Sequence, residues 1–250
     1  MDASLITAVI LTRDEERNLP RALTSLPRGM EIFVLDACSR DHTLQFARAS
    51  GARVVQREWT NFVEARRFAL TQVNTPWTLM LDADEALDDV LRDAINAASE
   101  ACDCYAMRRT TYFCGKPMRI WAGERLLRLF RTDRATLVAH PAAAPAIPIH
   151  EAWTCNGEVG ALPGTLLHYS YPDVATYRSK YERYTSLEAA GLRPSVARVL
   201  LETVKSLPRA MWLLFGRGAF LDGPRGWYVA LRSALYPAVA ARKALHYSSA

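Results

Sequence analysis

Residues 77–85 have the sequence WTLMLDADE, a mostly apolar run that leads directly into acidic residues. A short apolar run of this kind predicts a buried β-strand. Asp82 and Asp84 then lie together where the strand ends. Two neighbouring carboxylates repel each other unless a cation lies between them, and their hard oxygen atoms suit Mg²⁺ or Mn²⁺. The stretch therefore indicates a divalent metal site or, alternatively, a solvated loop whose acids favour the start of the next helix.

Three further short apolar runs precede this one, at residues 5–11, 31–35 and 52–56. Nearly continuous apolar strands are typical of a parallel sheet covered on both faces. Helices are expected between them, and the expected N-terminal caps are Asn18, Asp41 and Asn61. This alternation predicts an α/β fold, with a Rossmann-like, mostly parallel sheet and flanking helices. In such a sheet, ligands bind at the carboxyl ends of the strands.

After residue 101 the pattern changes. Strands are expected at residues 104–113 and 126–130, an Ala/Pro loop at 139–148, and a strand, turn and strand at 158–171. From residue 172 the pattern is helical. The chain is therefore expected to have three parts: a nucleotide-sugar-binding half (1–100), an acceptor-binding half (101–171) and a C-terminal helical extension (172–250).

Polar residues also follow the first two predicted strands. Thr12–Glu16 follows the first strand, and Asp36 begins the cluster after the second, with Ser39 and Asp41 close behind. The Asp36 carboxylate is placed to accept a hydrogen bond from a nucleotide base or a ribose hydroxyl, although the same residues also suit a turn and a helix cap. Three polar clusters at successive strand ends of one sheet favour a binding site over loops alone.

Four segments together resemble the nucleotide-sugar-binding half of glycosyltransferase family 2, whose members are inverting enzymes with the GT-A fold. They are AVILTRDEERNLPRALTSL, EIFVLDACSRDHTLQFA, VVQREWTNFVEARRFAL and WTLMLDADEAL. Later segments resemble a narrower branch that includes bacterial lipopolysaccharide inner-core β-glucosyltransferases. These are YFCGKPMRI, RLLRLFR, IHE, LLHYSY and GAFLDGPRGWYVALRSALY. The resemblance covers almost the whole chain.

The resemblance implies an inverting transfer of a sugar from a nucleotide diphosphate, such as UDP-glucose, to a lipid-linked saccharide such as lipopolysaccharide core. It implies that Asp84 binds Mg²⁺ or Mn²⁺ directly and that Asp82, the second acid of the metal site, lies nearer the ribose. It also implies a general base at Glu151, which would deprotonate the acceptor hydroxyl. His150 is then a further metal or diphosphate ligand, unless the two roles are exchanged.

The remaining donor-site residues follow from the same resemblance. Thr12 and Glu15 match the segment that lines the nucleotide pocket, and Asp36 matches the acid that contacts the base. Two residues depart from the family pattern. Arg40 replaces a small hydroxyl residue, and Arg67 stands where the branch often has an amide. Both add positive charge near the donor, which leaves the identity of the base and sugar open.

Arg125, Arg128 and Arg131 recur every third residue among apolar ones. Guanidinium groups in such an array either neutralise phosphates of the donor or acceptor, or form a solvated strand edge. The residues alone favour neither alternative.

The formal net charge of +5 suits anionic partners. Residues 209–221 and 227–241 are apolar with embedded arginine, which predicts either interfacial helices on anionic lipid or amphipathic helices packed on the protein. No uncharged run approaches the length that spans a bilayer, and the first apolar run is too short for a signal peptide. With the resemblance, these features predict a peripheral protein on the inner, cytoplasmic face of the cytoplasmic membrane.

Five scattered cysteines do not form a disulfide framework and predict reduced thiols. Nucleic acid is not an expected partner, because the basic charge is dispersed and no known nucleic-acid module is present. A nucleotidyltransferase is one alternative function, but it usually has a glycine-rich, basic loop after the first strand, and here that loop is acidic. A non-catalytic membrane scaffold is another, which the presence of Asp82, Asp84 and Glu151 together disfavours.

Overall fold

The computed structural model describes residues 1–59, 61–139 and 151–247. The chain forms two compact units. The first consists of Met1–Thr110, Gly123–Ala139 and Glu151–Tyr169, and the second contains Thr111–Ala122 and the chain from Ser170 onward. The three-part division expected from the sequence stays a prediction.

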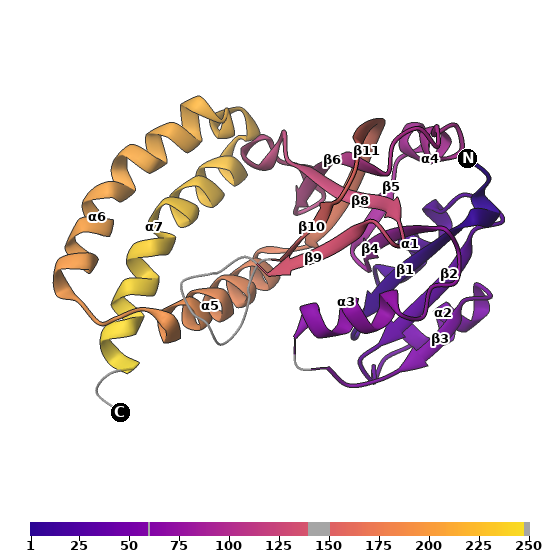
Figure 1. Cartoon of the computed structure of the whole chain (residues 1–250). Helices are drawn as coiled ribbons and strands as arrows, with labels where there is room; N and C mark the ends of the chain where they lie inside the picture. The colour runs from indigo at the N-terminus through magenta and orange to yellow at the C-terminus, as the bar shows by residue number, and fades with distance from the viewer. Residues whose placement is uncertain (60, 140–150, 248–250) are drawn as a thin grey trace. The chain divides into compact units, whose positions relative to one another are not determined.

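The first unit is built on four parallel strands, as the sequence predicts. They are β1 (Ile6–Thr12), β2 (Glu31–Asp36), β3 (Arg53–Gln56) and β4 (Trp77–Asp82), in the order β3-β2-β1-β4. The helices between and after them are α1 (Leu19–Ser25), α2 (Thr43–Ala49), α3 (Phe62–Leu70) and α4 (Asp89–Asn96). Figure 1 shows these four strands and four helices in indigo to magenta.

Both faces of β1, of β4 and of most of β2 are buried, whereas β3, at the edge of the sheet, is partly exposed. Alternate residues of β1 point to opposite faces, so Ile6 and Ile10 join a core that includes α1 and α4, whereas Val9 joins a core that includes α3. In the register of the sheet, Thr12 lies beside Asp36, and Leu11 lies beside Asp82. The carboxyl ends of β1, β2 and β4 therefore meet at one edge, where the polar clusters were expected.

Beyond β4 the same sheet continues in the order β4-β8-β6-β11-β5. Strand β8 is antiparallel to both β4 and β6, β5 is antiparallel to β11, and β7 is antiparallel to β6. The bounds are β5 (Glu85–Leu87), β6 (Cys104–Phe113), β7 (Lys116–Pro117), β8 (Arg125–Arg131) and β11 (Val159–Tyr171). A separate two-stranded sheet pairs β9 (Ala135–Ala139) with β10 (Glu151–Cys155). The result is a mixed sheet with flanking helices.

The expected strand, turn and strand at residues 158–171 is wrong, because β11 is one continuous strand. Pro163 and Gly164 bend it without reversing it. Gly164 has a φ of +89°, and a Cβ there would lie 2.3 Å from the backbone nitrogen of Leu91. A glycine in this conformation usually indicates a turn, but here it lets the strand approach the start of α4. The predicted Ala/Pro loop falls largely on residues 140–150, outside the described residues.

One of the three predicted helix caps is confirmed. The Asn61 side chain accepts a hydrogen bond from the Glu64 amide, but Asn18 makes no cap bond and donates to the Glu15 carboxylate instead. Asp41 lies one residue before the cap position of α2, which His42 occupies. From there its carboxylate still accepts bonds from the amide and hydroxyl of Thr43.

The expectation that all cysteines are free thiols is wrong for one pair. Cys104, at the start of β6, and Cys155, at the end of β10, form a disulfide, while Cys38, Cys102 and Cys114 are free. The bonded residues are 51 positions apart. No spacing motif connects them, and only the packing of the two-stranded sheet near β6 brings their sulfur atoms together.

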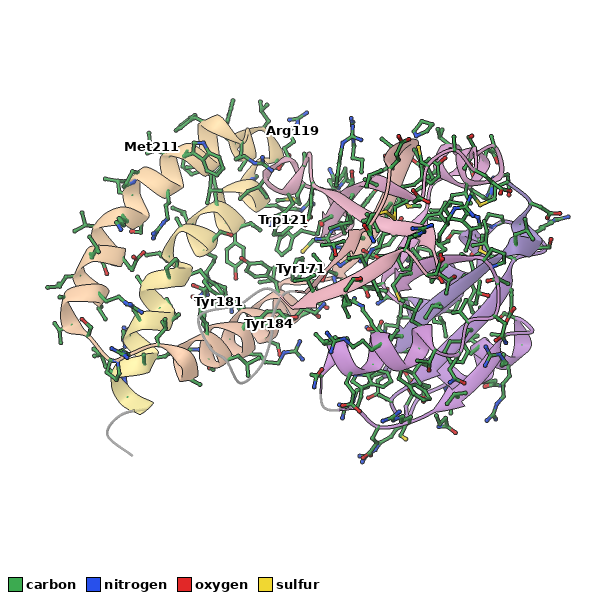
Figure 2. All side chains as sticks on the ribbon, in the orientation of Figure 1. Arg119, Trp121, Tyr171, Tyr181, Tyr184 and Met211 are labelled. Atoms are coloured by element: carbon green, nitrogen blue, oxygen red, sulfur yellow. A yellow bond between two sulfur atoms is a disulfide. The ribbon has the colours of Figure 1, made fainter. Side chains whose placement is uncertain are left out.

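The second unit contains the three long helices α5 (Val174–Gly191), α6 (Val196–Met211) and α7 (Pro224–Tyr247). A π-helical turn (Trp212–Gly216) and a 3₁₀ turn (Ala219–Asp222) connect α6 to α7, and further 3₁₀ turns lie at Ala3–Leu5 and Arg119–Trp121. Helix α7 lies alongside both α5 and α6 (Figure 1). Ring contacts of Phe113, Tyr171, Tyr177 and Tyr181 form the aromatic core of the second unit. Figure 2 labels Tyr171 and Tyr181 among these residues.

The helical character expected after residue 172 is confirmed, and helices extend to Tyr247. Within residues 1–59, 61–139 and 151–247, no helix combines the length and the apolar character that crossing a bilayer demands.

Candidate active site

Asp36 is fully buried at the end of β2. One carboxylate oxygen accepts hydrogen bonds from the hydroxyls of Thr12 (2.9 Å) and Ser39 (2.5 Å). The other accepts a bond from the Ser39 amide (2.8 Å) and a long one, 3.5 Å, from the Gln56 amide group. These bonds show that Asp36 and Ser39 form a turn, which was one of the two alternatives expected from the sequence. The long Gln56 contact leaves the second oxygen the less tightly held of the two.

The loops that follow β1 and β2 are tied together by their polar residues. The Asp14 amide donates to the Ser39 hydroxyl, and the Asp14 carboxylate accepts from the Arg40 amide. The Glu15 amide donates to the hydroxyl of Thr43. Asp14 has a φ of +54°, a conformation that aspartate tolerates better than most residues. These bonds fix the shape of the edge at which Thr12, Glu15 and Asp36 meet.

Asp82 lies between two arginines. Its Oδ1 pairs with Arg66 of α3 at 2.6 Å, and its Oδ2 pairs with Arg128 of β8 at 2.8 Å. Both guanidinium groups are almost completely buried. Arg128 also pairs with Glu85 at 2.7 Å, and Glu85 is fully buried and lies 3.6 Å from Arg109. The first acid of the Asp82–Asp84 pair is therefore part of an ionic cluster within the unit.

The arginines set the ionisation of this cluster. Burial alone would raise the pKa of Asp82, but Arg66 and Arg128 hold it well below its usual value. Burial raises the pKa of Glu85, although Arg128 opposes that shift. Burial would lower the pKa of Arg128, but Glu85 and Asp82 together raise it. Asp82 is therefore ionised at neutral pH, and both of its oxygens are already paired with cations.

Asp84 points to a different partner. Its Oδ2 lies 3.4 Å from Nε2 of His168 on β11, and its backbone carbonyl accepts a hydrogen bond from the Tyr169 amide. The Asp84 and His168 side chains are mostly but not completely buried. A carboxylate and an imidazole at this distance suit a shared divalent cation. Within the described part of the chain, no set of three or more His, Cys, Asp or Glu side chains gathers around one such point.

The structure thus brings Thr12, Glu15, Asp36, Asp82 and Asp84 to one edge of the sheet. Arg67 is not part of this group: it is exposed and approaches the carbonyl of Leu137 at 3.4 Å. Glu151 begins β10, where its backbone pairs with that of Ala139. His150 lies outside the described residues. The roles of these residues toward donor and acceptor stay predictions.

Four residues of the site were missed by the sequence interpretation, namely Arg66, Glu85, Arg109 and His168. Glu85 follows Asp84 directly, so the argument that placed Asp82 and Asp84 at the strand end could have included it. A buried acid is rarely left unpaired, so a cationic partner could also have been expected. Of the arginine triplet on β8, Arg128 neutralises protein carboxylates, which neither alternative had included. Arg131 pairs with Asp103, and Arg125 is exposed.

Comparison with known proteins identifies the family. Residues 7–146, more than half of the chain, match the model of glycosyl transferase family 2. The lipopolysaccharide core biosynthesis glycosyltransferase LpsC of Rhizobium meliloti (strain 1021) is 28% identical over 95% of this chain and 91% of its own. A glycosyltransferase of Rickettsia bellii (strain RML369-C) is 37% identical over 87% of this chain and 80% of its own.

Among solved structures, the mannosyltransferase PcManGT of Pyrobaculum calidifontis superposes with a TM-score of 0.52. It is 16% identical, and the alignment covers 98% of this chain and 88% of that protein. At this identity the likeness concerns the fold alone, and it agrees with the expected GT-A-like arrangement of a mixed sheet with flanking helices. The chain belongs to glycosyl transferase family 2 and is a glycosyltransferase.

Proposed function

We propose that this glycosyltransferase transfers a hexose from a UDP-hexose such as UDP-glucose to a lipid-linked saccharide such as lipopolysaccharide core, with inversion at the sugar. The observation that carries the proposal is the position of Asp84, which faces His168 at the sheet edge where β1, β2 and β4 end. The acceptor class is supported by the likeness to LpsC over nearly the whole chain.

A divalent cation fits the Asp84–His168 pair. Mg²⁺ in proteins has almost only oxygen ligands, so an imidazole beside a carboxylate favours Mn²⁺. PcManGT was solved with GDP-Man and Mn²⁺. When bound, the cation supplies positive charge that stabilises the departing diphosphate. Asp82 then serves as an oriented acceptor near the ribose rather than as a first metal ligand, because Arg66 and Arg128 already occupy its two oxygens.

The other donor contacts follow from the same edge. Thr12 and Glu15 line the nucleotide pocket, and the less tightly held oxygen of Asp36 faces the base, in place of its long contact to Gln56. The nucleotidyltransferase and scaffold alternatives lose their support once the chain is a member of this family.

Glu151 is the proposed general base, because inversion needs a carboxylate that removes the acceptor proton on the face opposite the leaving group. His150, its neighbour, is the proposed further ligand of the metal or diphosphate. The acceptor's lipid anchor would bring the protein to the inner, cytoplasmic face of the membrane as a peripheral protein.

The test is donor binding by calorimetry. Wild type should bind one nucleotide sugar among the UDP, GDP, ADP and dTDP sugars, and only with Mn²⁺ or Mg²⁺ present. Asp84→Ala should remove this metal-dependent binding, whereas Asp133→Ala, which changes an exposed aspartate of the same unit, should not. Binding that is unaffected by chelation, or that survives in Asp84→Ala, would overturn the metal assignment.

Glu151→Gln separates binding from chemistry. The variant should retain metal-dependent donor binding and lose transfer, since the amide cannot accept the acceptor proton. Transfer at the wild-type rate would exclude Glu151 as the base. Loss of donor binding would instead assign it to the metal site.

A further inference from the structure

Helix α6 exposes a continuous apolar stripe. Val196, Leu200, Val204, Leu207 and Met211 recur at intervals of three or four residues and therefore lie on one side of the helix, and we call them the α6 stripe. All five are exposed, Val204 by 73% and Leu207 by 69%. Figure 2 labels Met211 at the outer edge of this helix. An ordinary surface helix would direct such a stripe toward the protein core.

The polar side of α6 faces inward instead. Glu202, Ser206 and Arg209 are less exposed than the α6 stripe, and Glu202 pairs with Arg209 at 2.5 Å. Helix α6 packs against α7. The polar residues of the helix therefore make contacts within the unit, and its apolar side is left exposed. Large exposed apolar side chains continue past the helix end. They include Trp212, Phe215, Leu221, Trp227 and Leu231.

The same region is strongly basic. Residues 192–250 contain nine arginines and lysines but only two acids, Glu202 and Asp222. Arg198 and Lys205 are exposed on α6 itself, on a different side of the helix from the α6 stripe. An exposed apolar stripe on a basic helical segment, followed by tryptophan, is the composition of a helix that lies in the interface of an anionic bilayer.

We propose that the α6 stripe inserts into the headgroup–acyl boundary of a membrane that contains anionic lipid. The 16 residues of α6 make a helix about 24 Å long, which would lie in the plane of the interface. A second copy of the chain fits this surface less well, because two equally basic segments would repel each other. The inference deepens the proposed function, since it assigns the membrane contact of a lipid-linked acceptor to α6 rather than to residues 209–221 and 227–241 alone.

The test is flotation with vesicles of phosphatidylcholine, with and without phosphatidylglycerol, in the absence of donor and acceptor. Wild type should float with the anionic vesicles. The double variant Val204→Ser/Leu207→Ser should bind at least about tenfold more weakly. Val90→Ser/Val159→Ser is the matched control, since it removes two exposed apolar side chains of the first unit, and it should bind like wild type.

Two results would overturn the inference. The first is equal flotation of the stripe variant and wild type, or no flotation of wild type. The second is a wild-type dimer in sedimentation velocity that the stripe variant alone abolishes, which would assign the stripe to a second copy. Because the assay contains no nucleotide sugar, its failure leaves metal-dependent donor binding unaffected, so the two proposals are tested separately.

Discussion

Asp82 has a guanidinium on each of its carboxylate oxygens, and one of these, Arg128, also holds the fully buried Glu85. A buried ion pair adds little stability compared with an apolar pair, but removing one partner leaves an uncompensated charge. The cluster therefore depends most on Arg128, the residue that contacts both acids. Its proximity to Asp84 means that a structural defect here would also disturb the proposed metal site.

Arg128→Met should lower the free energy of unfolding by about 3–5 kcal/mol, because it leaves Glu85 buried without its closest cation. Urea unfolding followed by circular dichroism measures the effect. Arg125→Met, which removes an exposed arginine of the same strand, should change stability by no more than about 0.5 kcal/mol. Equal effects of the two variants would mean that the buried ion pairs of Arg128 do not stabilise the fold more than an exposed arginine does.

Acid should weaken the fold through Asp82. Its pKa in the folded protein lies below the usual aspartate value of 3.8, so its ion pairs stabilise the protein above about pH 4, and this contribution is lost as the pH falls further. In Asp82→Asn this loss is absent. The variant should therefore be less stable than wild type at neutral pH, and the difference should shrink toward pH 2. Urea unfolding measures the free energy of both proteins. A difference in stability between them that stays constant from neutral pH to pH 2 would contradict the lowered pKa of Asp82.

At this scale the sequence predicts only what is local. The spacing of Asp82 and Asp84 after an apolar run is enough to predict two acids at a strand end. Their partners Arg128 and His168 are 46 and 84 positions from them. Arg128 reaches the site on β8, which pairs with β4, and His168 reaches it on β11, which pairs with β5. Neither residue is marked by a local motif. The register of non-local strands is set by tertiary packing, which the sequence pattern alone does not specify.

At the scale of elements, the parallel strands were predictable and the later ones less so. The four apolar runs correspond to β1–β4, and three of these strands are mostly buried on both faces, as such a composition predicts. Strand β11 was misjudged because Pro163 and Gly164 usually form a turn, whereas here the glycine permits close packing on α4. The helical character of the chain after residue 172, which includes α6, was predicted, but the direction of the apolar side of α6 was not.

The Cys104–Cys155 disulfide has a testable consequence for β10. Cytosolic thiols are usually kept reduced, so thiol titration of the purified, unfolded protein decides whether the bond forms. We expect three reactive thiols without reductant and five with it. Reduction should lower the free energy of unfolding by about 2–4 kcal/mol, because the bond closes a long loop. Cys114→Ser, the control, should not change it, and five thiols without reductant would contradict the bond.

Gly226, in the first turn of α7, permits close contact with the preceding 3₁₀ turn. A Cβ at this position would lie 1.7 Å from the carbonyl oxygen of Ala219. Gly226→Ala should therefore lower the free energy of unfolding by about 1–3 kcal/mol or more. Gly223→Ala meets no atom within 4 Å and should cost only the strain of its positive φ, about 1–2 kcal/mol. Thermal unfolding measures both, and the reverse order would argue against this packing.

At the scale of the whole molecule, charge is unevenly distributed. The net charge is +5, yet residues 192–250 contain nine basic and two acidic residues, so the preceding part of the chain is slightly acidic. The overall value therefore understates the basic character of the C-terminal helices. Such an asymmetry orients a protein on an anionic surface, because only one part of it is attracted. The average composition could not reveal this, whereas the order of the residues does.

Membrane binding should consequently respond to salt. Each lysine or arginine near an anionic surface contributes about 1 kcal/mol, and salt screens this attraction. Raising NaCl from about 50 to about 500 mM should weaken flotation with anionic vesicles at least about tenfold. The apolar contribution of the α6 stripe should remain, since salt does not screen it. Complete loss of binding at high salt would mean that charge alone holds the protein on the vesicle.

The position of the charges, rather than their number, should decide the response. Arg198→Gln/Lys205→Gln removes two exposed cations of helix α6, and Arg28→Gln/Lys116→Gln removes two exposed cations elsewhere. The net charge of the two variants is the same. Only the first should bind anionic vesicles about tenfold more weakly at low salt, because the attraction acts within a Debye length of the surface. If both variants bind equally weakly, the attraction of the protein to the vesicle depends on its net charge alone. That result would mean that α6 does not contact the lipid.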